Sequence, residues 1–141
     1  MIFLESEERL SNDDIDEVES DLHIRLPIAV RSLYLESNGG IPSPYVFANQ
    51  EVDTVVAELL PLKAIGKGTA GDAFKKLVLT HKLVPKSMFP FAVDGSGDYF
   101  FVDWTEEDGH VYLYRGDTAA DNPLLDLEYT FNDFWRSLIP E

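Results

Sequence analysis

The stretch that decides the fold is Phe91-Ala-Val-Asp-Gly-Ser-Gly-Asp-Tyr-Phe-Phe-Val-Asp-Trp104, in which a polar DGSGD segment separates two apolar runs. Gly95 and Gly97 permit positive φ angles, and the side chains of Asp94 and Ser96 can bond nearby backbone amides. Because apolar residues flank this segment on both sides, the pattern predicts a tight turn between two strands.

Three short strands with a two-residue period are predicted around this turn. They are FPFAVD at 89–94, DYFFVDW at 98–104 and HVYLYR at 110–115, and the segment TEEDG at 105–109 separates the last two. Such spacing favours an antiparallel meander.

Two other interpretations of the glycine-containing segments fail. A calcium loop that starts at Asp94 needs glycine at its sixth position and glutamate at its twelfth, where Tyr99 and Thr105 stand. A phosphate loop needs glycines at a helix N-terminus with a nearby cation, but carboxylates flank DGSGD and a strand follows it. The segment 66–71 has the glycine spacing of a Walker loop, yet residues 72–73 are Asp-Ala where Lys-Ser/Thr is required.

Helix signals surround the meander. A first helix is predicted over 11–22, with acids in its first turns, and a second runs from Pro27 to a stop at Asn38-Gly39-Gly40. A third helix is predicted after an N-cap at Asp72, and a fourth over 130–138 with Thr130 as N-cap. Residues 41–50, with two prolines, are predicted as a loop, and 52–62 as a strand. This outline predicts an α+β fold, a single domain over residues 1–141 with a mainly antiparallel sheet flanked by helices.

The net charge of −15 is unevenly distributed. Residues 1–26 carry nine acids and two bases for a net −7, residues 27–93 five acids and seven bases for a net +2, and residues 94–141 twelve acids and two bases for a net −10. Such a field repels phosphate backbones and anionic lipids, which disfavours nucleic-acid and membrane partners. The charge has two alternative explanations: it attracts a basic protein partner, or it only keeps the protein soluble.

Composition restricts the class of protein further. The chain contains no cysteine, which excludes a disulfide framework, a thiolate nucleophile and a thiolate metal site. No apolar run approaches the ~18 residues of a membrane span. The first residues lack the basic region and cleavage site of a secretory signal. We therefore expect a soluble, cytoplasmic protein.

Patterns for catalysis and metal binding are weak. His23, His81 and His110 fall in different predicted elements without metal-ligand spacing. Asp103, in the middle of a predicted strand, is interpreted as a structural carboxylate that accepts backbone amide hydrogen bonds. A small-ligand site or an enzyme would have to use Asp98, Asp103 and His110. The leading prediction has no catalytic residue, no cofactor and no metal.

Five features follow one another along the chain: an acidic helix, an LP pair, a short helix with an NGG stop, a strand–GD–strand segment and a closing helix. They are Ile15…Glu19…Leu22, Leu26-Pro27, Leu33-Tyr34…Asn38-Gly39-Gly40, Phe89–Asp98 with Phe100–Asp103, and Thr130-Phe131…Phe134…Leu138. In this order they resemble the SMI1/KNR4 family of the SUKH superfamily. One departure is His23, where the family has glycine after its first helix, and residues 41–88 carry little of the resemblance.

The resemblance implies an α+β fold with a sheet flanked by helices. For a bacterial member it implies a non-catalytic immunity protein, which binds and neutralises a cognate bacterial toxin, often a nuclease, by occlusion. Fungal members act as interaction hubs in cell-wall signalling, and this compact, cysteine-free chain is more similar to the bacterial kind. A small-ligand-binding protein and a regulatory scaffold with several partners are the alternatives.

The predicted partner is therefore a basic protein toxin, which an acidic surface attracts and covers. Solvent-side acids and the aromatic residues of the proline-bearing loop are the candidate contacts. They are Asp13, Asp14, Asp16 and Glu17 on the first helix, Glu106, Glu107 and Asp108 in the turn before the third strand of the meander, and Tyr45 and Phe47. The sequence assigns neither the toxin nor an oligomeric state.

Overall fold

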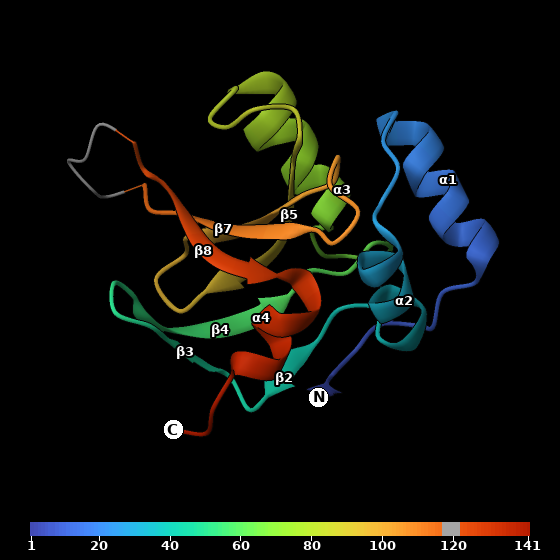
Figure 1. Cartoon of the computed structure of the whole chain (residues 1–141). Helices are drawn as coiled ribbons and strands as arrows, with labels where there is room; N and C mark the ends of the chain where they lie inside the picture. The colour runs from blue at the N-terminus through green and yellow to red at the C-terminus, as the bar shows by residue number, and fades with distance from the viewer. Residues whose placement is uncertain (117–121) are drawn as a thin grey trace.

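A six-stranded antiparallel sheet with the strand order β3-β4-β5-β6-β7-β8 forms the centre of the computed structural model, which describes residues 1–116 and 122–141 (Figure 1). The strands are β3 Val46–Ala48, β4 Asp53–Leu59, β5 Met88–Asp94, β6 Tyr99–Asp103, β7 His110–Tyr114 and β8 Leu124–Thr130. All neighbouring strands pair antiparallel. The predicted α+β fold and its meander are confirmed.

The turn between β5 and β6 is built around the Asp94 carboxylate. Its Oδ1 accepts a hydrogen bond from the backbone N–H of Ser96 at 2.9 Å. Gly97 adopts a φ of +93°, whereas a Cβ at Gly95 would lie 2.6 Å from Val55 Cγ2. The two glycines are therefore needed for different reasons, Gly97 for a left-handed backbone and Gly95 for the close approach of the Val55 side chain. The DGSGD segment is the predicted turn.

A short ribbon, β1 Ile2–Leu4 paired with β2 Ile41–Ser43, lies outside the main sheet. The prediction that residues 41–50 form a loop is wrong, because these residues contain β2 and β3. Pro42 has no N–H to donate to a ladder, but β2 pairs with a single strand and so keeps a free edge that tolerates proline.

The first helix, α1 Asn12–Leu22, lies within the predicted range and has the predicted acids in its first turn. Ser11 and Asp14 form a capping box in which each side chain accepts a hydrogen bond from the other's backbone N–H. Ile15 and Leu22 are buried. The helix ends at His23, which takes the left-handed conformation (φ 58°) that a glycine would adopt more easily.

The second helix, α2 Ile28–Glu36, differs from prediction at both ends. Pro27 is its N-cap and not its first helical residue, and its C-cap is Ser37, which is extended. The stop predicted at Asn38-Gly39-Gly40 lies beyond the helix. These residues are instead held by the N-terminal segment, because Glu7 N–H donates to the Asn38 carbonyl at 2.9 Å.

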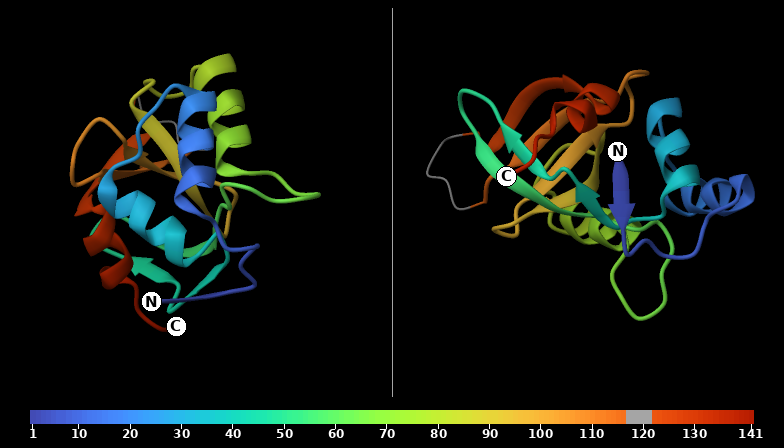
Figure 2. Two further views of the ribbon diagram at one scale, coloured as in Figure 1. Left: turned by 90° about the vertical axis from the view of Figure 1, so that its right-hand side faces the viewer. Right: turned by 90° about the horizontal axis from the view of Figure 1, so that it is seen from below.

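The third helix, α3 Ala70–Ala73, continues directly into the π-helix η1 Phe74–Thr80. Its N-cap is Thr69 and not the predicted Asp72, which is the third helical residue of a capping box. Threonine takes the cap because it has the extended backbone that this position requires. This helix lies beside α1, as Figure 2 shows on the left, and the Lys75–Asp21 ion pair of 2.9 Å joins the two.

The closing helix, α4 Phe131–Ser137, begins after the predicted N-cap Thr130 and packs against β7, β8 and α2. The rings of Phe131, Phe134 and Trp135 lie 5.0 to 5.8 Å from the ring of Phe91 on β5. This aromatic cluster joins the helix to the middle of the sheet. α3 and η1 pack against β5 as well.

One buried side chain, Asn38, joins three separate segments. Its Nδ2 donates to the carbonyl of Glu8 at 2.9 Å and to that of Lys63 at 2.8 Å, while its Oδ1 accepts from the N–H of Leu62 at 2.9 Å. Only 2% of the residue is exposed. The end of α2, the N-terminal segment and the loop after β4 are therefore fixed relative to one another.

We expect Asn38→Ala to lower the free energy of unfolding by about 3 kcal/mol, since it leaves three backbone groups without their partner. Urea unfolding of both chains measures this. Asn132→Ala, at an exposed position on α4, is the matched control and should change stability by less than about 0.5 kcal/mol. A loss below about 1 kcal/mol for Asn38→Ala would contradict the structural role of this side chain.

Candidate functional site

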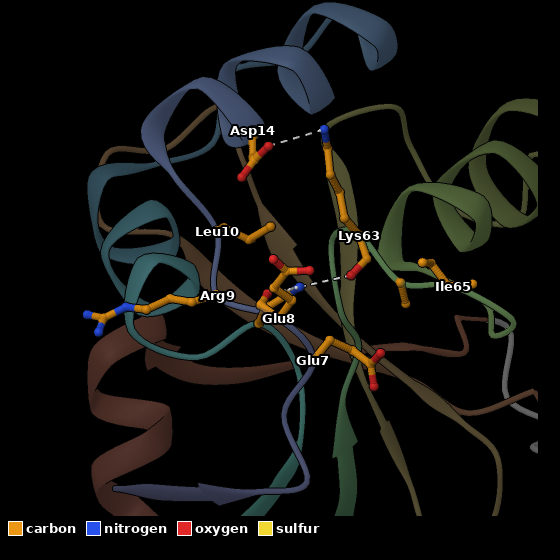
Figure 3. Close-up of a pocket in the computed structure, with 9 residues that line it drawn as sticks. Glu7, Glu8, Arg9, Leu10, Asp14, Lys63 and Ile65 are labelled. Atoms are coloured by element: carbon orange, nitrogen blue, oxygen red, sulfur yellow. Dashed lines mark hydrogen bonds and ion pairs between the residues drawn. The ribbon is translucent and has the colours of Figure 1, made fainter.

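A groove of about 360 Å³ lies between the N-terminal segment, the first turns of α1 and the loop after β4 (Figure 3). We call it the acidic groove. It is lined by Glu7, Glu8, Arg9, Leu10, Asp14, Asn38, Lys63, Ala64 and Ile65.

The walls of the acidic groove are held by the Asn38 side chain. Its hydrogen bonds to Glu8 and Lys63 join the two walls, and Ser6 Oγ adds a bond of 2.7 Å to the Gly39 carbonyl. Leu10 is 8% exposed and belongs to the hydrophobic core. The groove is thus part of the folded framework and needs little reorganisation before binding.

Two acids of α1 form ion pairs with Lys63, which lines the acidic groove. Its Nζ lies 3.1 Å from Glu17 Oε1 and 3.6 Å from Asp14 Oδ1. The hydrogen bond to Glu17, followed by the charges of Glu17 and Asp14, raises the pKa of Lys63. The hydrogen bonds from Ser11 lower the pKa of Asp14, and Lys63 lowers it further. Asp14 and Glu17 are therefore already occupied by structural partners.

Glu7 and Glu8 supply the negative charge on the rim of the acidic groove that is not neutralised by a cation of the described residues. Neither carboxylate forms an ion pair with another residue of the described ranges. The pKa of Lys67 is raised mainly by the hydrogen bond between Lys67 and Glu58. The negative charge of Glu7 raises it further, so Glu7 acts on Lys67 without contacting it. The Arg9 guanidinium points away from the groove in Figure 3 and donates to the carbonyl of Leu35.

Ile65 is the most exposed large hydrophobic side chain in the described part of the chain, at 99%. It lines the acidic groove from a loop that projects beyond the body of the molecule (Figure 2). A Cβ at Gly66 or Gly68 would meet no atom within 4 Å, so the loop is open around it. An aliphatic side chain held in water at the edge of a groove favours a binding role.

Of the four acids predicted on α1, three have partners within the protein. Asp16 Oδ1 lies 2.6 Å from an Arg31 nitrogen, and Asp14 and Glu17 flank Lys63. Asp13 is exposed. Only Asp14 lines the acidic groove.

The other predicted acids, Glu106, Glu107 and Asp108, are exposed in the turn between β6 and β7. Glu106 and Glu107 line a separate groove with residues 25–28, which follow α1, whereas the acidic groove touches the first turn of that helix. The structure therefore places the predicted acids in two groups near opposite ends of α1.

The two predicted aromatic contacts differ. Tyr45 is partly exposed and hydrogen-bonded to Glu141, which raises the pKa of its phenol. Phe47 is fully buried and its ring lies 5.4 Å from that of Phe134, so the expectation that it serves as a surface contact is wrong. The alternation along β3 turns its side chain into the core.

Of the alternative constellation of Asp98, Asp103 and His110, Asp98 is separated from the other two residues. Asp98 precedes β6 and Asp103 ends it, whereas Asp103 and His110 lie next to the Val102–Val111 pair at the same end of the β6–β7 ladder. The Asp103 carboxylate accepts hydrogen bonds from the N–H and hydroxyl of Thr105, in keeping with its predicted structural role. His110 Nε2 lies 2.6 Å from Asp126 Oδ1. Residues 1–116 and 122–141 contain no group of three or more side chains suited to a metal ion.

The sequence does carry a signal for Ile65, which was not among the predicted contacts. The loop KAIGKG over 63–68 places one isoleucine between lysines and glycines, where a polar residue would be expected. Glu7 and Glu8 have no comparable signal, because their position on the rim depends on the Asn38 hydrogen bonds.

Comparison with known proteins gives one match. The family model described as SMI1 / KNR4 family (SUKH-1) matches residues 9–137. No curated protein and no solved structure matches the chain. Among the described residues, no helix has both the length and the apolar character needed to cross a membrane.

Proposed function

The chain belongs to the SMI1/KNR4 family (SUKH-1), and from this premise we propose that it is a non-catalytic immunity protein. It binds a cognate bacterial toxin in the cytoplasm and neutralises it by covering the surface with which the toxin acts. The family includes immunity proteins, and the exposed Ile65 beside the acidic groove supports this role.

The observation that carries this proposal is the exposure of Ile65 beside the acidic groove. Ile65 is 99% exposed, so its transfer from water into a pocket of a partner would bury nearly the whole side chain. Full burial of an isoleucine contributes about 1.5–3 kcal/mol. Interfaces commonly combine such an apolar contact with a polar rim, and Glu7 and Glu8 form the rim here.

The charge of the chain indicates the kind of toxin. A net charge of −15 attracts basic proteins and accelerates their association. Enzymes that act on nucleic acid need a basic surface to bind phosphates, and an acidic partner can occupy that surface. A nuclease toxin fits this pattern best.

The test begins with affinity capture from the lysate of the bacterium that produces the chain. The captured protein is then expressed in a susceptible bacterium with and without the chain. We expect one basic protein that stops growth alone and is harmless when co-expressed. Its Kd should rise about tenfold between 0.05 and 0.5 M salt, because screening weakens the attraction of exposed charges. Captured proteins that are all harmless when expressed alone would contradict the proposal, and several weakly held ones would favour a scaffold.

Ile65→Asp should weaken toxin binding by at least about tenfold, since it removes the apolar contact and places a charge in its pocket. The melting temperature should not change, because the side chain touches little of its own protein. Leu83→Asp, at another exposed aliphatic residue (45%), is the matched control and should bind as the unmodified chain does. Equal neutralisation by Ile65→Asp and the unmodified chain would contradict the role of Ile65.

A further inference from the structure

A second groove, of about 460 Å³, lies between the segment that joins α1 to α2 and the turn between β6 and β7. We call it the Trp104 groove. It is lined by Arg25, Leu26, Pro27, Ile28, Trp104, Thr105, Glu106 and Glu107.

The Trp104 indole is held in a fixed position. Its Nε1 donates to the carbonyl of Lys86 at 2.7 Å, and its backbone N–H donates to the carbonyl of Ser87 at 2.9 Å. The next residue is fixed too, because the Asp103 carboxylate accepts from the Thr105 N–H at 2.9 Å. A ring whose edge and backbone are both bonded can offer its face to a ligand without losing further freedom.

The turn that carries the two glutamates is packed against the opposite wall. A Cβ at Gly109 would lie 2.9 Å from Val102 Cγ2 and 3.8 Å from Pro27 Cγ, so the end of the turn lies close to the α1–α2 segment. The N–H of Gly109 donates to the Glu106 carbonyl at 3.1 Å. The groove therefore has a hydrogen-bonded indole on one side and, on the other, a turn whose backbone is held close to the α1–α2 segment.

The lining combines two kinds of surface. Ile28 is 74% exposed and, with Pro27 and the indole of Trp104, gives an apolar and aromatic wall. Glu106 and Glu107 are exposed at the rim and form no ion pair within residues 1–116 and 122–141. The charge of Glu106 reaches into the sheet, since it contributes, after burial and Asp126, to the raised pKa of Tyr112.

An arginine side chain has the chemistry that this lining would recognise. Its methylene stem packs on aliphatic surface, its planar guanidinium stacks on an indole face, and its N–H groups bond carboxylates in pairs. Lysine offers a point charge without the planar stacking surface, so it fits less well. A phosphate or another acidic group would be repelled by the two glutamates.

We propose that the Trp104 groove binds an arginine side chain presented by the basic protein partner, with Trp104 as the stacking surface and Glu106 and Glu107 as the acceptors. This inference rests on the proposed function and gives the partner a second contact, near the other end of α1 from the acidic groove. Arg25, on the same rim, opposes the incoming cation and limits its affinity.

The test is a titration of the ¹⁵N-labelled full chain with N-acetyl-argininamide, followed by NMR, with N-acetyl-lysinamide as the matched probe. The chain has two tryptophans, and the indole of buried Trp135 serves as the internal reference. We expect saturable shifts of the Trp104 indole N–H and of the backbone amides at 25–28 and 104–107. Arginine should bind at least about fivefold more tightly than lysine.

Variants of the charged residues test how each of them contributes to arginine binding. Glu106→Gln with Glu107→Gln should weaken arginine binding about fivefold, and Arg25→Gln should strengthen it. Glu51→Gln, which removes an exposed acid outside the groove, should leave it unchanged. Equal shifts with both probes, or shifts that do not involve Trp104, would overturn the inference.

A failure of this inference can be told apart from a failure of the proposed function. If the chain neutralises a toxin and the Glu106→Gln/Glu107→Gln variant binds that toxin with the same affinity, the inference is wrong and the immunity function stands. If the probe binds as expected but no toxin is neutralised, the groove stands and the immunity function is wrong.

Discussion

Three hydrogen bonds of the Asn38 side chain determine how the candidate binding face is built. They fix the carbonyls of Glu8 and Lys63 and the N–H of Leu62 around one buried amide. They join the N-terminal segment directly to the loop after β4, and the bonds of Glu7 N–H to the Asn38 carbonyl and of Ser6 Oγ to the Gly39 carbonyl hold the N-terminal segment at the same place. The cost of leaving such backbone groups unpaired is what makes the arrangement specific.

The acids of the chain divide into those that support the fold and those that remain available. Asp14 caps α1, Asp94 and Asp103 organise turns, and Asp16 pairs with Arg31. The second kind, which includes glutamates at both grooves, remains on exposed loops and turns. A binding surface predicted from the net charge alone would therefore include acids whose carboxylates already have partners. The structure distinguishes these acids from the ones that are available to a partner.

The sequence predicted elements whose signals are local. The meander around DGSGD, the acidic start of α1 and the Thr130 cap of α4 depend on neighbouring residues, and all are present. The strands β1, β2, β3 and β8 depend on distant partners: Pro42 argued against β2, and only Leu127 is buried in β8. The candidate site was likewise predictable only where its signals are local. Acidic positions could be predicted, but the burial of Phe47 and the exposure of Ile65 follow from tertiary packing.

We propose that the face formed by the N-terminal segment and the loop after β4 binds the protein partner. Hydrogen–deuterium exchange of the chain, alone and in complex with its captured toxin, measures this directly. We expect the backbone amides of residues 5–10 and 62–69 to exchange more slowly in the complex. Unchanged exchange in both segments, with protection confined to β3, β4 or α4, would contradict it.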